Sequence, residues 1–178
     1  MEEIEVKIIG IDRRRVEEKL VTLGAKKIFD GEMHATYYDF PDKALGKAQD
    51  LLRLRKEGDK SVLVFKKFVH NEGAKVRREY EVSVSDFNTM QSILEGLGFS
   101  PWLVMRKHRV IYQLQNAHVD LDKYHDEYDF IPDFLEIEAP DIETIHQCAR
   151  LLGFGIEDCK PWTAVELAEH YRTKTTAH

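Results

Sequence analysis

The chain has 178 residues, of which 43% are hydrophobic and 33% are charged, and its formal net charge is −6. This length and composition suit one soluble domain with a core of its own. A mildly acidic balance argues against a nucleic-acid partner, because nucleic-acid-binding domains are more often basic. No apolar run reaches the length of a membrane span, and the acidic opening, MEEIEVKI, does not resemble a signal peptide. The two cysteines lack metal-site spacing, so we expect a cytoplasmic protein with reduced thiols.

Three segments repeat the same order of an alternating strand, an amphipathic helix and a Leu-Gly pair. The pairs end at Gly24, Gly98 and Gly153. Glycine accepts the left-handed backbone that ends many helices. The expected N-caps are Asp12, Asp86 and Asp141. We therefore predict three helices between these caps and glycines, a further helix over 163–171 and a disordered tail over 173–178.

Alternating segments between the helices predict the strands. They lie near 2–9, 27–39, 50–56, 61–69, 74–84, 103–114, 116–123 and 133–139. Eight mostly antiparallel strands in one chain favour closure. The sequence therefore predicts an α+β fold in a single domain over 1–172: an eight-stranded antiparallel closed β-barrel with helices packed outside.

The charged residues of these strands are sorted by sign. Residues at i and i+2 share a face of a strand. The acidic pairs on one face are Glu3 and Glu5, Glu79 and Glu81, Asp120 and Asp122, and Glu136 and Glu138. The basic pairs are Arg53 and Arg55, and Lys107 and Arg109. Further cations on such faces are Lys7, Lys66 and Arg77.

For any single strand, a solvated outer face is the simplest explanation of such charges. Like charges at i and i+2 repel one another, however, and six such pairs in one chain call for counter-ions. If the helices cover the apolar strand faces, the charged faces point inward and line a polar tunnel. Carboxylates there suit Mg²⁺ or Mn²⁺, and arginine and lysine suit phosphate oxygens.

These motifs together resemble the CYTH proteins, also called triphosphate tunnel metalloenzymes, which include class IV (CyaB-type) adenylyl cyclases and thiamine triphosphatases. The opening EIEVK matches the Glu-x-Glu-x-Lys signature of this family. The family's order continues with LRLR, VFK, RREYE, KHR, VDLD and LEIE over nearly the whole chain. One such motif is weak support, whereas the ordered set is specific.

The resemblance implies a tunnel that binds a triphosphate, together with Mg²⁺ or Mn²⁺. The implied substrate-binding residues are Lys7, Arg53, Arg55, Lys66, Arg77, Lys107 and Arg109. The implied metal ligands are Glu3, Glu5, Glu136 and Glu138, with Glu79, Glu81, Asp120 and Asp122 as further candidates. Lys66 and Lys107 are the candidate catalytic residues. Three departures bear on subfamily and substrate: Ala35, Lys67, and the pair Trp162 and Thr163 stand where many relatives have other residues.

Several alternatives stay open at the level of sequence. Hydrolysis of ATP, thiamine triphosphate or tripolyphosphate requires only the tunnel, and it is favoured. Cyclisation of ATP to cyclic AMP and pyrophosphate uses the same phosphate site, and a non-catalytic polyphosphate or nucleotide sensor would use it as well. An acidic loop over 122–133 is a candidate gate for the tunnel. A sheet face that helices leave uncovered could pair two subunits in a homodimer.

Overall fold

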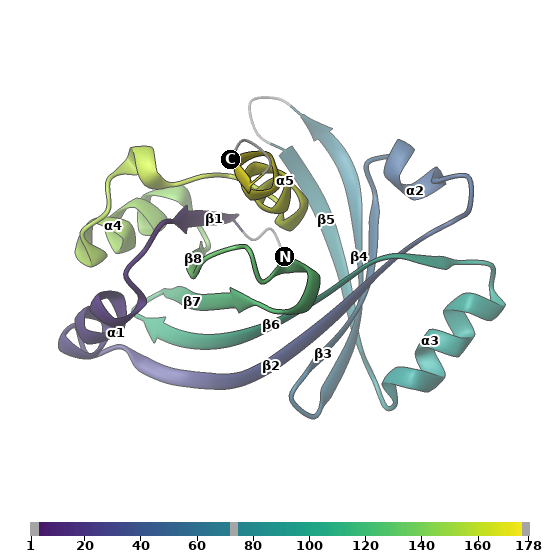
Figure 1. The fold of residues 1–178 in the computed structure, drawn as a ribbon, viewed down its shortest axis with the longest axis horizontal. Helices are drawn as coiled ribbons and strands as arrows, with labels where there is room; N and C mark the ends of the chain where they lie inside the picture. The colour runs from purple at the N-terminus through teal and green to yellow at the C-terminus, as the bar shows by residue number, and fades with distance from the viewer. Residues whose placement is uncertain (1–3, 72–74, 176–178) are drawn as a thin grey trace. The chain divides into compact units, whose positions relative to one another are not determined.

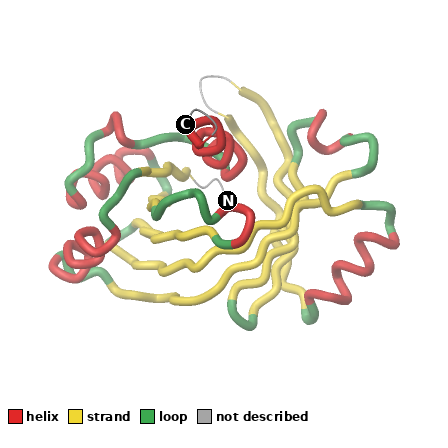
Figure 2. Tube along the Cα trace, in the orientation of Figure 1, coloured by secondary structure: helices red, strands yellow, loops and turns green. Residues whose placement is uncertain are grey.

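The structure is a computed structural model that describes residues 4–71 and 75–175, with the backbone alone at 70, 71, 75–77, 174 and 175. Its strands are β1 (Ile4–Ile9), β2 (Lys26–Asp39), β3 (Leu51–Glu57), β4 (Lys60–Asn71), β5 (Lys75–Val84), β6 (Ser100–Leu114), β7 (Ala117–Tyr124) and β8 (Phe134–Ala139). They form one sheet in the order β1-β8-β7-β6-β2-β3-β4-β5 (Figures 1 and 2). The eight predicted strands and the antiparallel sheet are confirmed. The prediction of a closed barrel goes further than the observed sheet, in which β1 and β5 are the two end strands.

The helices are α1 (Arg13–Thr22), α2 (Ala44–Lys47), α3 (Phe87–Gly96), α4 (Ile142–Leu152) and α5 (Ala164–Thr175). The three predicted N-caps are confirmed, because Asp12, Asp86 and Asp141 each accept a hydrogen bond from a backbone N–H three residues later. The glycines that follow α1, α3 and α4 have φ angles of 75°, 94° and 90°. Helix α2 was not predicted because four residues are too short for a helical pattern. Helix α5 runs to Thr175, beyond its predicted end at 171.

By the packing of its Cα atoms the chain divides into two compact units. The first unit contains the described residues between 32 and 106, with the second half of β2, strands β3 to β5, the first half of β6, and helices α2 and α3. The second unit contains the described residues 4–31 and 107–175, with β1, the start of β2, the second half of β6, β7, β8, and helices α1, α4 and α5. No helix in the described ranges is both long and apolar enough to span a membrane.

In the second unit, one face of the sheet carries the apolar core. Val6, Ile8, Val119, Leu121 and Ile137 lie on this face, buried against α1 and α4. Helix α4 contributes Ile145, Ala149 and Leu152, and α1 contributes Val16 and Leu20. Because side chains alternate along a strand, the residues between the apolar positions point to the opposite face of the sheet. That opposite face carries the charged pairs.

The first unit follows the same rule. Leu52 and Leu54 of β3 pack with Tyr38 of β2 against Phe87 and Leu94 of α3. Burial of apolar surface between sheet and helix stabilises both units, at about 25 cal/mol for each Å² removed from water. In each unit, therefore, helices cover the apolar face of the strands, as the sequence predicted, and the arginines of β3 lie on the other face.

Candidate functional site

The register of the second unit sets its charged residues opposite one another. Lys7 of β1 faces Glu136 of β8, and Glu136 faces Asp120 of β7. Arg109 of β6 faces Asp122 of β7. Directly opposite residues in an antiparallel pair share a face of the sheet, with Cβ atoms about 4.5–5.5 Å apart. The strand pairing thus gathers two cations and three of the predicted metal ligands on one surface.

Arg109 is the centre of this cluster. Its Nε donates to Oδ1 of Asp122 over 2.7 Å, and one of its terminal nitrogens also contacts Asp122. The same nitrogen donates to Glu136, and the other terminal nitrogen contacts Asp120. Arg109 is only 8% exposed. A buried guanidinium with charged partners at every nitrogen is held firmly in one orientation.

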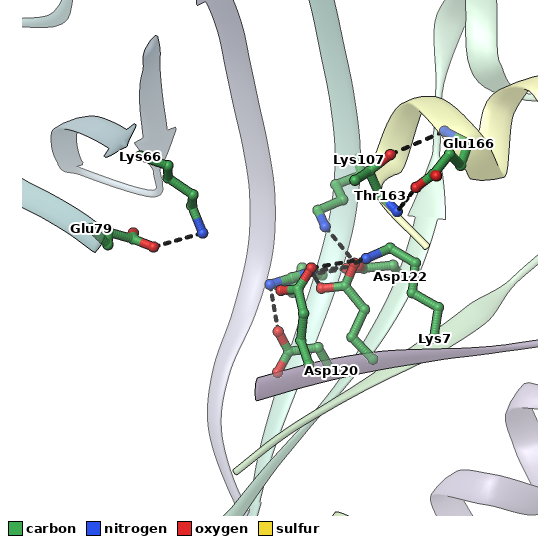
Figure 3. A network of polar contacts seen from close by, with 11 residues as sticks. Lys7, Lys66, Glu79, Lys107, Asp120, Asp122, Thr163 and Glu166 are labelled. Carbon is green, nitrogen blue, oxygen red and sulfur yellow. Dashed lines mark hydrogen bonds and ion pairs between the residues drawn. The ribbon is translucent and has the colours of Figure 1, made fainter. Parts of the chain in front are cut away.

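Two lysines complete the cluster, as Figure 3 shows for Lys107 and Asp122. Nζ of Lys107 lies 2.6 Å from Asp122 and 5.6 Å from the centre of the Tyr124 ring. Nζ of Lys7 lies 3.0 Å from Glu136 and 3.2 Å from Glu5. Lys7 is almost fully buried, whereas half of the Glu5 side chain is exposed. Glu5 therefore places one carboxylate at the solvent-accessible margin of a cluster that is otherwise buried.

Burial and charge act against each other in this cluster. Burial raises the pKa of Asp120 to about 7, because the lowering effect of Arg109 is weaker than desolvation together with the neighbouring carboxylates. Burial also raises the pKa of Glu136, but Lys107, Lys7 and Arg109 outweigh it and hold that pKa well below its ordinary value. Oδ1 of Asp120 is buried and, among the described residues, has no hydrogen-bond partner. Asp120 thus has one carboxylate oxygen that receives no hydrogen bond from the described residues of this chain.

The first unit carries a second, looser set of charges. Lys66 of β4 faces Glu79 of β5, and their side chains point toward each other with 2.6 Å between Nζ and the carboxylate oxygen (Figure 3). Arg55 lies 3.6 Å from Glu81 and 3.8 Å from Glu57. These ion pairs are partly exposed. The two contacts of Arg55 are also longer than those of Arg109, whereas the pair between Lys66 and Glu79 is not. Exposed pairs of this kind contribute little to stability, typically about 0–1 kcal/mol.

The structure describes the remaining predicted site residues to different extents: some in full, one by its backbone alone and one not at all. Arg53 of β3 lies opposite Tyr37 and Val64, on the face that carries Arg55. Glu138 of β8 lies opposite Glu5. Arg77 belongs to β5, but its side chain is outside the description. Glu3 lies outside the described residues altogether.

A family model described as the CYTH domain matches residues 1–154. The match covers far more than half of the chain. The chain belongs to the CYTH family.

Relatives of this CYTH protein agree with that assignment. A Methanocaldococcus jannaschii protein named as a putative adenylate cyclase is 30% identical over 160 residues, which cover 90% of this chain and 89% of the relative. A solved Pyrococcus horikoshii protein is 30% identical, with a TM-score of 0.76 over 94% of this chain and 99% of its own. A solved Hippeastrum protein, described as a putative adenylyl cyclase with a dominant triphosphatase activity, is 20% identical, with a TM-score of 0.62 over 98% of this chain and 96% of its own. At that identity, the last likeness shows a shared fold.

The carboxylates of the CYTH protein fit a divalent cation by the chemistry of their donor atoms. Mg²⁺ and Mn²⁺ prefer hard oxygen ligands, and the buried Oδ1 of Asp120 is an oxygen without a hydrogen-bond partner among the described residues. Glu5 and Glu136 lie beside the same lysine. Within the described ranges, which do not include Glu3, no three ligand side chains are yet arranged around one point. A cation would compete with Lys7 for oxygens of Glu5 and Glu136, whereas Oδ1 of Asp120 has no competing donor among the described residues.

The sequence did not reveal two supports of the site. Tyr124, which was assigned to a loop, ends β7 and lies beneath Lys107 while stacking on Phe134. The backbone of Lys160 makes two hydrogen bonds of 2.8 Å with the backbone of Lys7. A local sequence pattern predicts neither contact. The contact of Tyr124 with Lys107 depends on the register of two strands, and Lys7 and Lys160 are far apart along the chain.

The loop between β7 and β8 is tied to the strand that precedes it. Nζ of Lys123 donates to the backbone oxygens of Asp129 and Ile131 over 2.6 and 2.9 Å. Tyr128 and Ile131 of the loop are buried. The loop thus has a fixed attachment, and its role as a gate remains a proposal.

Proposed function

We propose that this CYTH protein is a metal-dependent enzyme that hydrolyses an organic or inorganic triphosphate. One observation carries the proposal: the second unit buries Lys7 and Arg109 with Asp120, Asp122 and Glu136 on the sheet face that is not used for the core. Burying so many charges gains little or no stability even when they pair with one another, so the cluster calls for a role other than stability. A site for a polyanion and a cation is such a purpose.

The proposed roles follow the chemistry of each side chain. Arg53 and Arg55 of the first unit would bind phosphate oxygens, because guanidinium groups form two-pronged hydrogen bonds with them. Lys66 and Lys107 would carry charge to the reacting phosphoryl group and orient the attacking water. Phosphoryl transfer depends mainly on such positioning and charge neutralisation. Lys7 would add a further cation, and Arg77 remains a candidate phosphate ligand.

Mg²⁺ or Mn²⁺ is the proposed cofactor. The carboxylates that would hold it are Glu3, Glu5, Glu136 and Glu138, with Asp120 as the next candidate. Glu79, Glu81 and Asp122 are further candidates. When bound, the cation would neutralise phosphate charge. The residues of this chain would supply the rest: lysines and arginines that bind and orient the substrate.

A second candidate function is cyclisation of ATP to cyclic AMP and pyrophosphate. The name of the Methanocaldococcus jannaschii relative, at 30% identity, favours it. Both reactions require the same cradle for three phosphates. They differ in the attacking group: water on the terminal phosphorus in hydrolysis, the ribose 3′-hydroxyl on the α-phosphorus in cyclisation.

Product analysis tests the proposal directly. The protein is incubated separately with ATP, thiamine triphosphate and tripolyphosphate, in Mg²⁺, Mn²⁺ or EDTA, and the products are separated. We expect orthophosphate in the presence of metal, no turnover in EDTA and no turnover by the Glu5→Gln variant. Cyclic AMP with pyrophosphate would establish the cyclase instead. Tight binding of tripolyphosphate without turnover of any substrate would overturn both and point to a sensor.

A further inference from the structure

We infer that Tyr124 is a positioning residue, which holds the ammonium group of Lys107 ready for a phosphate anion through the face of its ring. This inference rests on the proposed function, in which Lys107 carries charge to the reacting phosphoryl group. Tyr124 is not one of the charged residues from which the sequence predicted the site. Its role follows from the way in which the strands and the neighbouring rings place it.

Strand register brings the tyrosine ring to the lysine. Tyr124 ends β7 directly opposite Lys107 of β6, so both side chains lie on the sheet face that carries the charged pairs. Nζ of Lys107 lies 5.6 Å from the centre of the ring, within the distance at which the negative face of a ring attracts a cation. Among the described residues, the hydrogen-bond partner of this ammonium group is Asp122, at 2.6 Å. An ammonium group has three N–H donors, so this arrangement leaves donors for an anion.

The ring of Tyr124 is itself held in place. It is buried, and it stacks on Phe134 with 5.5 Å between the ring centres and 22° between the ring planes. Tyr128, which is also buried, lies against it at 6.2 Å. Phe134 of β8 lies directly opposite Asp122, the carboxylate partner of Lys107. A buried ring packed against two others has little freedom to turn, so it offers the lysine a fixed surface.

Lys7 shows what a different set of partners does to a lysine in the same unit. Its Nζ lies 3.0 Å from Glu136 and 3.2 Å from Glu5, so two carboxylates hold it. In the place of Tyr124, a second carboxylate could hold Lys107 equally firmly, but it would add negative charge beside a site for a polyanion. A ring attracts the ammonium group through its quadrupole and carries no net charge. Tyr124 therefore fixes Lys107 without cancelling its charge.

A binding measurement on two variants tests the role of the ring. Tripolyphosphate is titrated in EDTA by calorimetry, so that neither metal nor turnover enters the result. We expect Tyr124→Leu to weaken binding about fivefold, whereas Tyr124→Phe, which keeps the ring, should bind within about twofold of the unaltered protein. Equal losses in the two variants would assign the effect to the hydroxyl group and overturn the inference.

Two controls separate positioning of the lysine from general packing. In the Lys107→Met background, Tyr124→Leu should weaken binding by less than about 1.5-fold, because a residue that acts through Lys107 then has nothing to act on. Tyr112 of β6 is the matched ring: Nζ of Lys27 lies 5.9 Å from its centre, but Tyr112 belongs to the apolar core. We expect Tyr112→Leu to leave binding unchanged. A full loss in the Lys107→Met background, or an equal loss in Tyr112→Leu, would overturn the inference.

A measurement without any change at Tyr124 covers the case in which Tyr124→Leu does not fold. The ε-methylene protons of Lys107 are identified by nuclear magnetic resonance through their loss in Lys107→Met. We expect a nuclear Overhauser contact between these protons and the ring protons of Tyr124, both before and after tripolyphosphate is added in EDTA. Absence of this contact in either state would contradict the inference. Failure of the proposed function would appear separately, as absent product from the unaltered protein with tripolyphosphate binding and the contact intact.

Discussion

Lys66 and Glu79 face each other across β4 and β5, with 2.6 Å between Nζ and the carboxylate oxygen. The next residue, Lys67, points to the opposite face of the same strand, where its side chain is largely exposed and lies 3.8 Å from Asp50. Two consecutive lysines thus occupy two different environments. One belongs to the candidate site and the other does not.

This difference predicts unequal effects of the same substitution. We expect Lys66→Met to lower kcat by about 100-fold or more, the lower range for a group that assists proton or phosphoryl transfer. Lys67→Met, the matched control, should keep kcat within about twofold, because surface substitutions away from a site have small effects. Steady-state kinetics with the best triphosphate substrate measures both. Equal losses in the two variants would argue against a catalytic role for Lys66.

Asp120 predicts how stability varies with pH. Its pKa in the folded protein, about 7, lies above its ordinary value of 3.8, so the folded state retains a proton that the unfolded state has released. Raising the pH from about 4 through 7 therefore costs folded-state stability at this residue. We expect the unfolding free energy of Asp120→Asn, relative to that of the unaltered protein, to increase from pH 5 to pH 8. Urea unfolding in EDTA at both pH values measures it, and a difference that does not vary with pH would refute the assignment.

We expect alanine substitutions at Gly153 and Gly96 to have opposite effects on the free energy of unfolding. Gly153 follows α4 with a φ of 90°, and an added Cβ would clash with Nζ of Lys19, which donates to the backbone of Leu152. Gly153→Ala should destabilise the protein by about 1–2 kcal/mol. Gly96 ends α3 in ordinary helical backbone, with no atom within 4 Å of an added Cβ, so Gly96→Ala should stabilise by about 0.5–1 kcal/mol. Chemical denaturation of both variants is the measurement, and the same sign for both would be the unexpected result.

Lys123 predicts whether the loop before β8 affects turnover. Removing its Nζ takes away two hydrogen bonds to the backbone of Asp129 and Ile131. We expect Lys123→Met to speed amide hydrogen exchange over 125–133 and, if the loop is a gate, to change KM or kcat. Faster exchange with unchanged kinetics would remove the gate hypothesis while confirming the attachment of the loop.

The strands and helices could be predicted because their signals are local. Alternation placed all eight strands, and single aspartates and glycines marked the ends of three helices. Register is not local. That Arg109 lies opposite Asp122 depends on how β6 and β7 align across the turn at Gln115, which has a left-handed backbone with φ of 54°. The sequence therefore indicated which residues carry charge on one face, but not that cations and carboxylates would bind one another.

The two backbone hydrogen bonds between Lys160 and Lys7 set a lower limit on the length of a working fragment. The family match ends at residue 154, before Lys160. A chain shortened to that point would retain every matched residue, but β1 would lose its bonded neighbour on the side away from β8. The buried Leu167 and Ala168 of α5 would be absent as well. Homology alone would thus place the cut where the strand carrying Lys7 loses its one described bridge on that side, although its pairing with β8 would remain.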